Sequence, residues 1–245
     1  MIINKVYHLA DLHIRNLQRH KEYRQVFRKF LKQVKEDKIE DSVIYIAGDI
    51  AHAKTEMSPE LVKEISWFLT ECSKLREVIL ITGNHDCNLN NQHRLDVLTP
   101  IIDNLQNPRI HYLRDTGVYN IHNLTFVVYS IMDNKENWPK GDSVKGENTI
   151  CLFHGPVNKA QTDIGYTVSS NSFQVDMFDG FDMAMLGDIH KRQTFGKGYE
   201  HIAYAGSMIQ QNHGELLENH GYLLWDIPTR TFTEHHIHND YGFLT

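Results

Sequence analysis

The sequence has few cysteines and no long apolar run. Its 245 residues include three cysteines, and no two of them form a Cys-x-x-Cys pair. A sparse, odd set argues against a disulfide framework and is typical of a reducing compartment. The longest apolar stretches, such as residues 78–81, are far too short to span a bilayer, and the first residues enter a strand-like run without a signal peptide. We therefore expect a cytoplasmic protein without a membrane partner.

Positive charge is also scarce. The chain has 25 lysines and arginines against 31 aspartates and glutamates, which gives a formal net charge of -6. This balance excludes a protein that binds nucleic acid mainly through an overall basic surface. If DNA is the substrate, metal cations or a basic partner must supply much of the positive charge.

The first half of the chain alternates strand-like and helix-like segments. Apolar runs predict strands at residues 2–9, 42–47 and 77–82, and residues 18–35 have the apolar spacing of an amphipathic helix. Ser58 and Pro59 predict the start of a second helix, as its N-cap and first-turn residues, and residues 95–105 predict a third. Strand-helix-strand repetition of this kind implies parallel strands joined by crossovers in one sheet.

The second half is richer in strands. Candidates are residues 118–121, 124–130, 149–153, 183–186, 201–204, 222–226 and 231–237. The polar segment 133–148 is expected to be a long surface loop. No internal repeat, low-complexity tract or linker divides the sequence. We predict one α/β domain over residues 1–245, built as a sandwich of two sheets.

Polar clusters follow five of these apolar strands. Because the carboxyl ends of strands in open α/β sheets form the crevice where ligands bind, we expect the five clusters to converge in space. The clusters are Asp11-Leu12-His13, Gly48-Asp49, Gly83-Asn84-His85-Asp86, His154-Gly155 and Gly187-Asp188-Ile189-His190.

The residue types in these clusters are those of a metal site. Asp11 and His13 lie on the same side of an extended segment, so both can reach one ion. The two oxygens of a carboxylate such as Asp49 can bridge two cations, and the amide oxygen of Asn84 adds a ligand without adding charge. Mixed imidazole, carboxylate and amide donors suit manganese, iron, zinc or nickel better than calcium.

Most of the sixteen histidines lie outside these clusters. Residues 234–238 approach a dense histidine tract, but their alternation predicts a solvated terminal strand. Single histidines on strands are usually buried and hydrogen-bonded. We therefore interpret the histidines without strand-end context as structural, namely His8, His111, His122 and His201.

The ordered motifs resemble those of the calcineurin-like metallophosphoesterase superfamily over essentially the whole chain. His52 after Asp49, the segment Arg94-Leu95-Asp96, and the segment Tyr204-Ala205-Gly206-Ser207 are similar to the SbcD nuclease family. That family includes the archaeal and eukaryotic double-strand-break repair nuclease and phage recombination endonuclease subunits. The resemblance implies a four-layer α/β/β/α sandwich flanked by helices, with no separate DNA-capping domain evident in this chain.

The resemblance also implies two divalent metal ions, with manganese first and iron, zinc, nickel or magnesium as alternatives. Such ions lie about 3.5–4 Å apart, activate water and clamp the phosphate. The first ion would be held by Asp11, His13, Asp49 and His190, and the second by Asp49, Asn84, His154 and Asp188.

Asp188 departs from the family pattern, which has histidine at this position. Aspartate is a metal ligand in its own right, but it adds negative charge and removes an imidazole. This change is expected to alter metal preference or weaken catalysis. The alternative is that Asp188 only hydrogen-bonds a ligand histidine.

Four further residues receive catalytic or substrate-binding roles by resemblance. His85 is expected to protonate the leaving group and Asp86 to orient the His85 ring. His52 and Arg15 are expected to contact the phosphate. The alternatives are that His85 supports a ligand structurally, that His52 caps a turn, and that Arg15 faces solvent.

The leading hypothesis is a manganese-dependent DNA nuclease, exonuclease or endonuclease, acting in repair, recombination or replication. Its expected partners are DNA, an SbcC-like ATPase subunit and a second copy in a homodimer. The apolar stripe of residues 95–105 favours a role in the core over a role in a dimer interface.

Residue 245 lies roughly where a DNA-capping domain would begin. The chain is therefore a minimal family member, receives a cap from another molecule, or is a fragment. A phosphatase or phosphodiesterase for nucleotides, small molecules or phosphoproteins, and a catalytically weak scaffold, are the alternatives.

Overall fold

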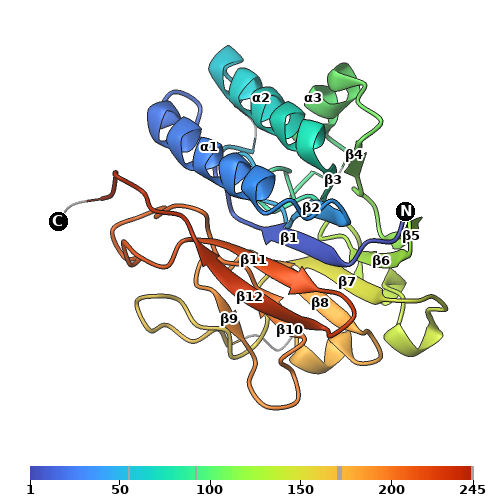
Figure 1. The fold of residues 1–245 in the computed structure, drawn as a ribbon. Coiled ribbons are helices and arrows are strands. Elements are labelled where there is room, and N and C mark those ends of the chain that lie inside the picture. The colour runs from blue at the N-terminus through green and yellow to red at the C-terminus, as the bar shows by residue number, and fades with distance from the viewer. Residues whose placement is uncertain (55, 92, 170–172, 244–245) are drawn as a thin grey trace.

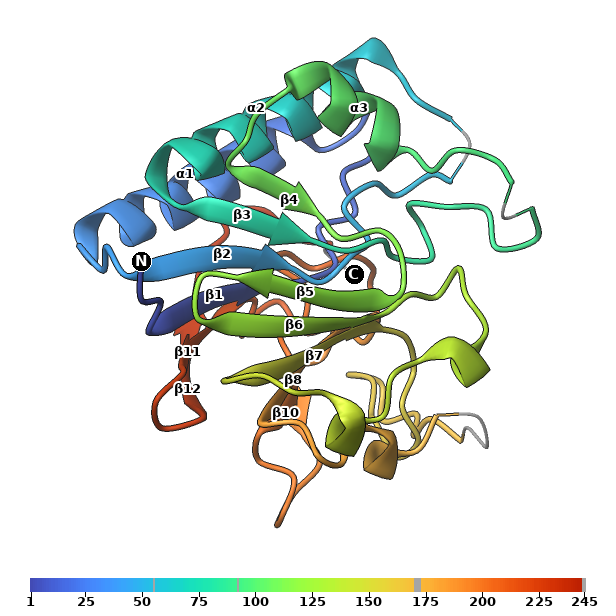
Figure 2. The ribbon, with the colours of Figure 1, turned by 90° about the vertical axis from the view of Figure 1, so that its right-hand side faces the viewer.

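The structure consists of two six-stranded sheets packed face to face (Figure 1). It is a computed structural model that describes residues 1–54, 56–91, 93–169 and 173–243. Helices α1 (His20–Glu36), α2 (Pro59–Leu75) and α3 (Leu98–Leu105) cover the outer face of the first sheet (Figures 1 and 2). None of the helices in the described ranges is long and apolar enough to cross a membrane.

The first sheet joins strands from both ends of the chain. Its four consecutive N-terminal strands are parallel to one another, and the two C-terminal strands add an antiparallel edge. In spatial order the strands are β12 (Thr231–His236), β11 (Gly221–Asp226), β1 (Lys5–Leu9), β2 (Ser42–Ile46), β3 (Glu77–Leu80) and β4 (Ile110–Tyr112).

The second sheet has a parallel centre and antiparallel edges. Its parallel strands are β6, β7, β8 and β10, while β5 and β9 pair in the opposite direction at the two edges. In spatial order the strands are β5 (Gly117–Ile121), β6 (Leu124–Tyr129), β7 (Thr149–His154), β8 (Met183–Gly187), β10 (Ile202–Tyr204) and β9 (Gln193–Thr194).

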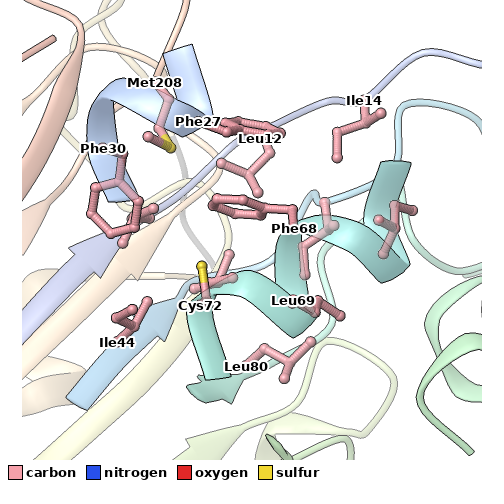
Figure 3. Close-up of a cluster of buried hydrophobic side chains, with 14 of the residues drawn as sticks. Leu12, Ile14, Phe27, Phe30, Ile44, Phe68, Leu69, Cys72, Leu80 and Met208 are labelled. Carbon is pink, nitrogen blue, oxygen red and sulfur yellow. The ribbon is translucent and has the colours of Figure 1, made fainter. Parts of the chain in front are cut away.

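The core is divided by the first sheet into two layers. All five residues of β2 are buried, because both faces of this strand are covered. Ile44 faces the helices, where Phe27 of α1 stacks on Phe68 of α2 with ring centroids 4.0 Å apart (Figure 3). Val43 belongs instead to the apolar layer between the two sheets, together with side chains such as Phe126.

The outer face of the second sheet is covered by loops and three short 3-10 helices. These are η1 (Lys135–Asn137), η2 (Gly141–Ser143) and η3 (Val175–Phe178). They enclose a third apolar cluster that contains Tyr129, Phe153 and Phe178. The predicted fold class, a two-sheet α/β sandwich flanked by helices, is therefore confirmed.

The predicted helices and strands are present in the structure, and the strands that were not predicted are short. Ser58 is the N-cap of α2 as expected, since its hydroxyl accepts the N–H of Leu61 at 3.1 Å. Leu98 and Ile101 of α3 are buried in the core, which fits the core interpretation for this part of the apolar stripe. Leu95, the first residue of the predicted stripe, lies before the helix and is 70% exposed. Strands β4 and β9 were not predicted, because two or three residues are too few to show a hydrophobic period.

Candidate metal centre

The five polar clusters all lie at the carboxyl ends of strands. Strands β1, β2 and β3 of the first sheet and β7 and β8 of the second lead into them. The structure brings these ends together at one edge of the sandwich, as the interatomic distances below show. The seven side chains that the sequence predicts as metal ligands converge there, from both sheets.

The first group of donor atoms surrounds His13. The Nε2 atom of His13 lies 3.0 Å from Nε2 of His190 and 3.4 Å from Oδ2 of Asp49. Nε2 of His190 is 4.0 Å from Oδ1 of Asp11. Donor atoms of Asp11, His13 and His190 all lie within 4.8 Å of one another. This is the set expected for the first ion.

The second group surrounds His154. The Nε2 atom of His154 lies 3.0 Å from Oδ1 of Asn84, 3.3 Å from Oδ1 of Asp49 and 3.8 Å from Oδ1 of Asp188. Because one oxygen of Asp49 faces each group, its carboxylate has the placement of a bridging ligand.

The spacing and chemistry of these donors fit metal ions. Ligand atoms about 2.0–2.2 Å from one ion lie roughly 3 to 3.6 Å from each other. The distances from His13 to His190 and Asp49, and from His154 to Asn84 and Asp49, lie in this range, while Asp11 and Asp188 are slightly farther away. Burial also lowers the pKa of His13 well below its usual value, so this ring is neutral. A neutral imidazole beside carboxylate and amide oxygens is a ligand set for a divalent transition metal.

Hydrogen bonds fix which nitrogen of each ring faces the centre. Nδ1–H of His154 donates to the carbonyl of Ala47 at 2.6 Å, and Nδ1–H of His190 donates to Oε1 of Glu215 at 2.7 Å. Since both partners only accept, each ring carries a proton on Nδ1, and Nε2 is the nitrogen that faces the centre. Ligand histidines in metalloproteins are oriented in this way.

Burial and neighbouring charges shift the pKa values of the side chains in the centre in opposite directions. Burial raises the pKa of Asp11 to about 7. Burial acts in the same direction on Asp49, but the neighbouring His154 holds the pKa of Asp49 well below its usual range. Burial opposes charge on His190, yet Glu215 and Asp11 raise its pKa to about 9. The buried carboxylates are thus balanced by positive charge on histidines, a role that divalent cations fill when bound.

Four of the aspartate and histidine positions have left-handed backbone. The φ angles are 51° at Asp11, 45° at His13, 51° at Asp49 and 98° at Asp188. Such conformations cost on the order of 1–3 kcal/mol each and persist only where surrounding structure imposes them. Backbone hydrogen bonds impose them here, for example from the N–H of His13 to the carbonyl of Asp49 at 2.8 Å.

Close backbone approach explains the glycines beside the ligands. A Cβ atom at Gly83 would lie 2.1 Å from the backbone nitrogen of Asp49, and one at Gly48 would lie 2.7 Å from Nδ1 of His154. Any side chain at these positions would displace a ligand. Glycine is therefore required where the strand ends cross.

Asp188 lies where a ligand of the second group would be. Its backbone N–H donates to both carboxylate oxygens of Asp11, at 3.1 and 3.2 Å. Its own carboxylate is 3.8 Å from Nε2 of His154, which is too long for a hydrogen bond. The alternative that Asp188 only hydrogen-bonds this ligand histidine is therefore not favoured.

His85 lies beside the first group with one ring nitrogen free for chemistry. Nδ1–H of His85 donates to the carbonyl of His52 at 2.8 Å, so Nε2 is the open nitrogen. The backbone N–H of His85 donates to Oδ1 of Asp49 at 2.7 Å, which ties the residue to the bridging position.

Asp86 has a different role from the one expected. Its carboxylate is fully buried and accepts the backbone N–H groups of Ala51 at 2.8 Å and Gly83 at 2.9 Å. The prediction that Asp86 orients the His85 ring is therefore wrong, because the His52 carbonyl does so. Asp86 instead holds together the loops that follow β2 and β3.

His52 and Arg15 line the open side of the first group. Both border a cavity of about 220 Å³ together with His13, Asp49 and His85. Nη2 of Arg15 donates to the carbonyl of Gln211 at 3.2 Å, while its buried Nε has no partner within the described ranges. Burial and the nearby Arg15 lower the pKa of His52 to about 4. Both residues therefore border the space beside the first group of donor atoms.

Sequence reasoning missed Glu215. Besides His190, its carboxylate accepts the backbone N–H of Gln211 and Nδ2–H of Asn212, both at 2.7 Å. Glu215 lies in a loop that follows no predicted strand, so the strand-end rule gave no signal for it. Its contact with His190 depends on tertiary structure alone.

Two segments of the narrower resemblance have structural roles. Asp96 accepts the backbone N–H groups of Leu98 and Thr99 and so caps the start of α3. Gly206 has a φ of 73°, and a Cβ there would lie 2.7 Å from the carbonyl oxygen of His190. Both segments therefore support the fold of the site.

We predict that Asp49→Asn removes metal-dependent stabilisation. A ligand at about 100 times its Kd stabilises a folded protein by about 2.7 kcal/mol, which raises the melting temperature. Manganese titrated into the wild type should raise Tm by several degrees, while Asp49→Asn should show little response. The exposed Asp103→Asn on α3 is the matched control and should respond like the wild type. An equal manganese response in all three proteins would contradict the assigned centre.

We also predict that Glu215→Gln weakens metal binding without unfolding the protein. Loss of such a supporting carboxylate typically costs about 10–100-fold in metal affinity. Competition with a fluorescent chelator measures this loss, and circular dichroism checks the fold. Glu218→Gln, an exposed change in the same loop, should leave the affinity unchanged. Equal affinities for the two variants would remove Glu215 from the site.

Comparisons with known proteins found a relative by sequence and a similar fold among solved structures. "Uncharacterized protein R555" of Acanthamoeba polyphaga mimivirus is 42% identical over 256 residues, which cover 99% of this chain and 19% of the relative. This chain thus spans about a fifth of the length of that relative. The crystal structure of TT1561 of Thermus thermophilus matches with a TM-score of 0.55, covering 96% of this chain and 100% of its own at 10% identity. That likeness shows the fold alone.

The match that decides the family covers most of the chain. Residues 4–192 match the family described as calcineurin-like phosphoesterase, and this range contains every predicted ligand from Asp11 to His190. The family implies a metal-dependent hydrolase of phosphoesters. The chain belongs to the calcineurin-like phosphoesterase family.

Proposed function

We propose that this protein is a two-metal-dependent nuclease that hydrolyses phosphodiester bonds in DNA. The observation that carries the proposal is that cavities open on both sides of the centre. One of about 220 Å³ adjoins His13 and His85, and another of about 540 Å³ adjoins Asn84 and His154. A phosphodiester carries a substituent on each side of phosphorus, whereas a monoester carries one. Space on both sides therefore supports a diester substrate.

In this proposal two sets of residues hold the two metal ions. Asp11, His13, Asp49 and His190 would hold one ion, and Asp49, Asn84, His154 and Asp188 the other. Bound divalent ions supply Lewis-acid polarisation of the phosphate and lower the pKa of water.

Three residues outside the ligand set complete the proposed chemistry. The His52 carbonyl holds the His85 ring with Nε2 toward the cavity, where a proton on Nε2 can pass to the leaving oxygen. Arg15 and the His52 ring contact phosphate oxygens from the same side. Arg15 adds the local positive charge that the acidic chain lacks overall.

The proposed partners follow from the motif resemblance. They are DNA as substrate, an SbcC-like ATPase subunit and a second copy of this chain, with manganese as the metal. A basic partner would supply the charge that this chain does not offer to the DNA backbone. The alternative function, a phosphatase or phosphodiesterase for nucleotides, small molecules or phosphoproteins, uses the same centre with a different substrate.

A side-by-side assay with manganese tests the proposed substrate class. Labelled single- and double-stranded DNA would be compared with a generic phosphodiester and a phosphomonoester. We expect cleavage of DNA and of the diester. Hydrolysis confined to the monoester would contradict the nuclease proposal. Absence of both hydrolysis and bound transition metal after manganese loading would favour a scaffold.

We predict that His85→Ala loses turnover and keeps its metal. A general acid increases the rate about 10²–10⁴-fold, and its effect is largest when the leaving group is poor. Cleavage of DNA should therefore fall much more than cleavage of an activated nitrophenyl diester. Metal analysis should match the wild type. The exposed His238→Ala is the control and should be fully active. Unchanged DNA cleavage by His85→Ala would remove His85 from the mechanism.

A further inference from the structure

A large aromatic cavity opens beside the second group of metal ligands. It has a volume of about 540 Å³, which lies within the roughly 300–1,000 Å³ of typical small-molecule sites. Asn84, His154 and Asp188 form one side of it, so the cavity is continuous with the metal centre. Its apolar lining comes from Leu89, Ile131, Trp138, Phe153, Pro156 and Phe173.

Trp138 provides a fixed aromatic wall for this cavity. Its ring stacks on Tyr129 with centroids 4.7 Å apart and an interplanar angle of 11°, and on Phe173 at 5.8 Å and 21°. Its Nε1–H donates to the carbonyl of Ser130 at 3.3 Å. Trp138 remains partly exposed although its neighbour Phe153 is fully buried. The indole is therefore held rigidly by these neighbours, and the part of it that stays exposed lines the cavity.

The rim of the cavity is polar and carries both charges. Asp133, Asn134, Lys135 and Glu136, at and just before η1, line it. Three of these residues are exposed, and together they offer hydrogen-bond donors and acceptors. An apolar aromatic wall with a polar rim suits a flat heteroaromatic ring that has polar groups on its edge.

We propose that this cavity binds the base of the nucleotide next to the scissile phosphate. The inference rests on the proposed function and names the substrate class within it. A base whose sugar is esterified to a phosphate at the metal centre would enter the cavity past His154, because the cavity and the centre share that side chain. Stacking on an aromatic side chain accepts any base, so the cavity selects for a base without selecting its identity.

The cavity also selects the state of the DNA. A base in a duplex is stacked on both faces and paired at its edge, so it reaches the aromatic wall of this cavity only after leaving the helix. The substrate of this site is therefore an unpaired nucleotide, at a single strand, a frayed end or a flipped position. Continuous duplex is the poorer substrate.

A binding experiment tests the cavity independently of hydrolysis. Ligand-observed NMR with EDTA-treated protein would compare adenosine with ribose. We expect adenosine to bind and ribose not to bind. Trp138→Leu should weaken adenosine binding at least about tenfold, Trp138→Phe should retain most of it, and Trp67→Phe on α2 should match the wild type. Equal binding of adenosine and ribose by the wild type would overturn the proposal, and this comparison needs no variant.

A kinetic experiment tests the same inference in the loaded enzyme. The nitrophenyl diester of thymidine 5′-phosphate would be compared with its abasic deoxyribose analogue. We expect the base to lower KM about tenfold and Trp138→Leu to remove that advantage, whereas the control Trp67→Phe should keep the wild-type KM for both esters. Equal KM values for the two esters in the wild type would overturn the proposal. If neither ester is cleaved, the proposed function fails, while the NMR comparison still decides the cavity.

A strand-state experiment separates the two sources of a base. Free nucleotide diesters, single-stranded oligonucleotides and blunt duplexes would be supplied at equal concentration of cleavable bonds. Faster cleavage of the single strand than of the duplex, with the difference lost in Trp138→Leu, supports an unpaired DNA strand. Preference for duplex would overturn the inference. Cleavage of the small diester alone would support the cavity and contradict the DNA source.

Discussion

The centre depends on one buried carboxylate that joins the two sheets. Oδ2 of Asp49 lies 3.4 Å from Nε2 of His13, on the first sheet, and Oδ1 lies 3.3 Å from Nε2 of His154, on the second. Oδ1 also accepts the backbone N–H of His85, so the proposed proton donor is positioned by the same group. The candidate metal ligands of both sheets and the proposed proton donor thus all contact one side chain. The negative charge of that side chain is costly to bury without cations.

The surrounding backbone holds the Asp49 carboxylate in its position between the two sheets. Asp49 itself has left-handed backbone, and Gly48 and Gly83 provide the space in which the strand ends cross. Asp86 ties the two loops together through backbone N–H groups instead of serving the histidine beside it. Strain near the ligands is balanced by a fully buried apolar core on both faces of the first sheet. A sandwich of two sheets allows ligands from distant parts of the sequence to meet without a flexible loop.

Much of this could be predicted from the sequence, for a physical reason. Buried strands that end in polar residues leave a strong local signal, so the two sheets and the convergence of the candidate ligands follow from apolar runs and their last residues. Features that depend on packing left no such signal. The contact of Glu215 with His190 joins a loop to a strand end. The aromatic cavity brings Trp138, from a segment predicted only as a polar loop, together with Phe153 and Phe173 from distant parts of the chain. The prediction for Asp86 failed because neighbours in sequence need not be neighbours in a hydrogen-bond network.

The bridging position of Asp49 is tested most directly by a crystal structure of the manganese-soaked protein with anomalous scattering. We expect two peaks about 3.5–4 Å apart, one on each side of the Asp49 carboxylate. The first peak should lie against His13 and His190, and the second against Asn84 and His154. A single peak, or two peaks that do not share Asp49, would contradict that bridging position.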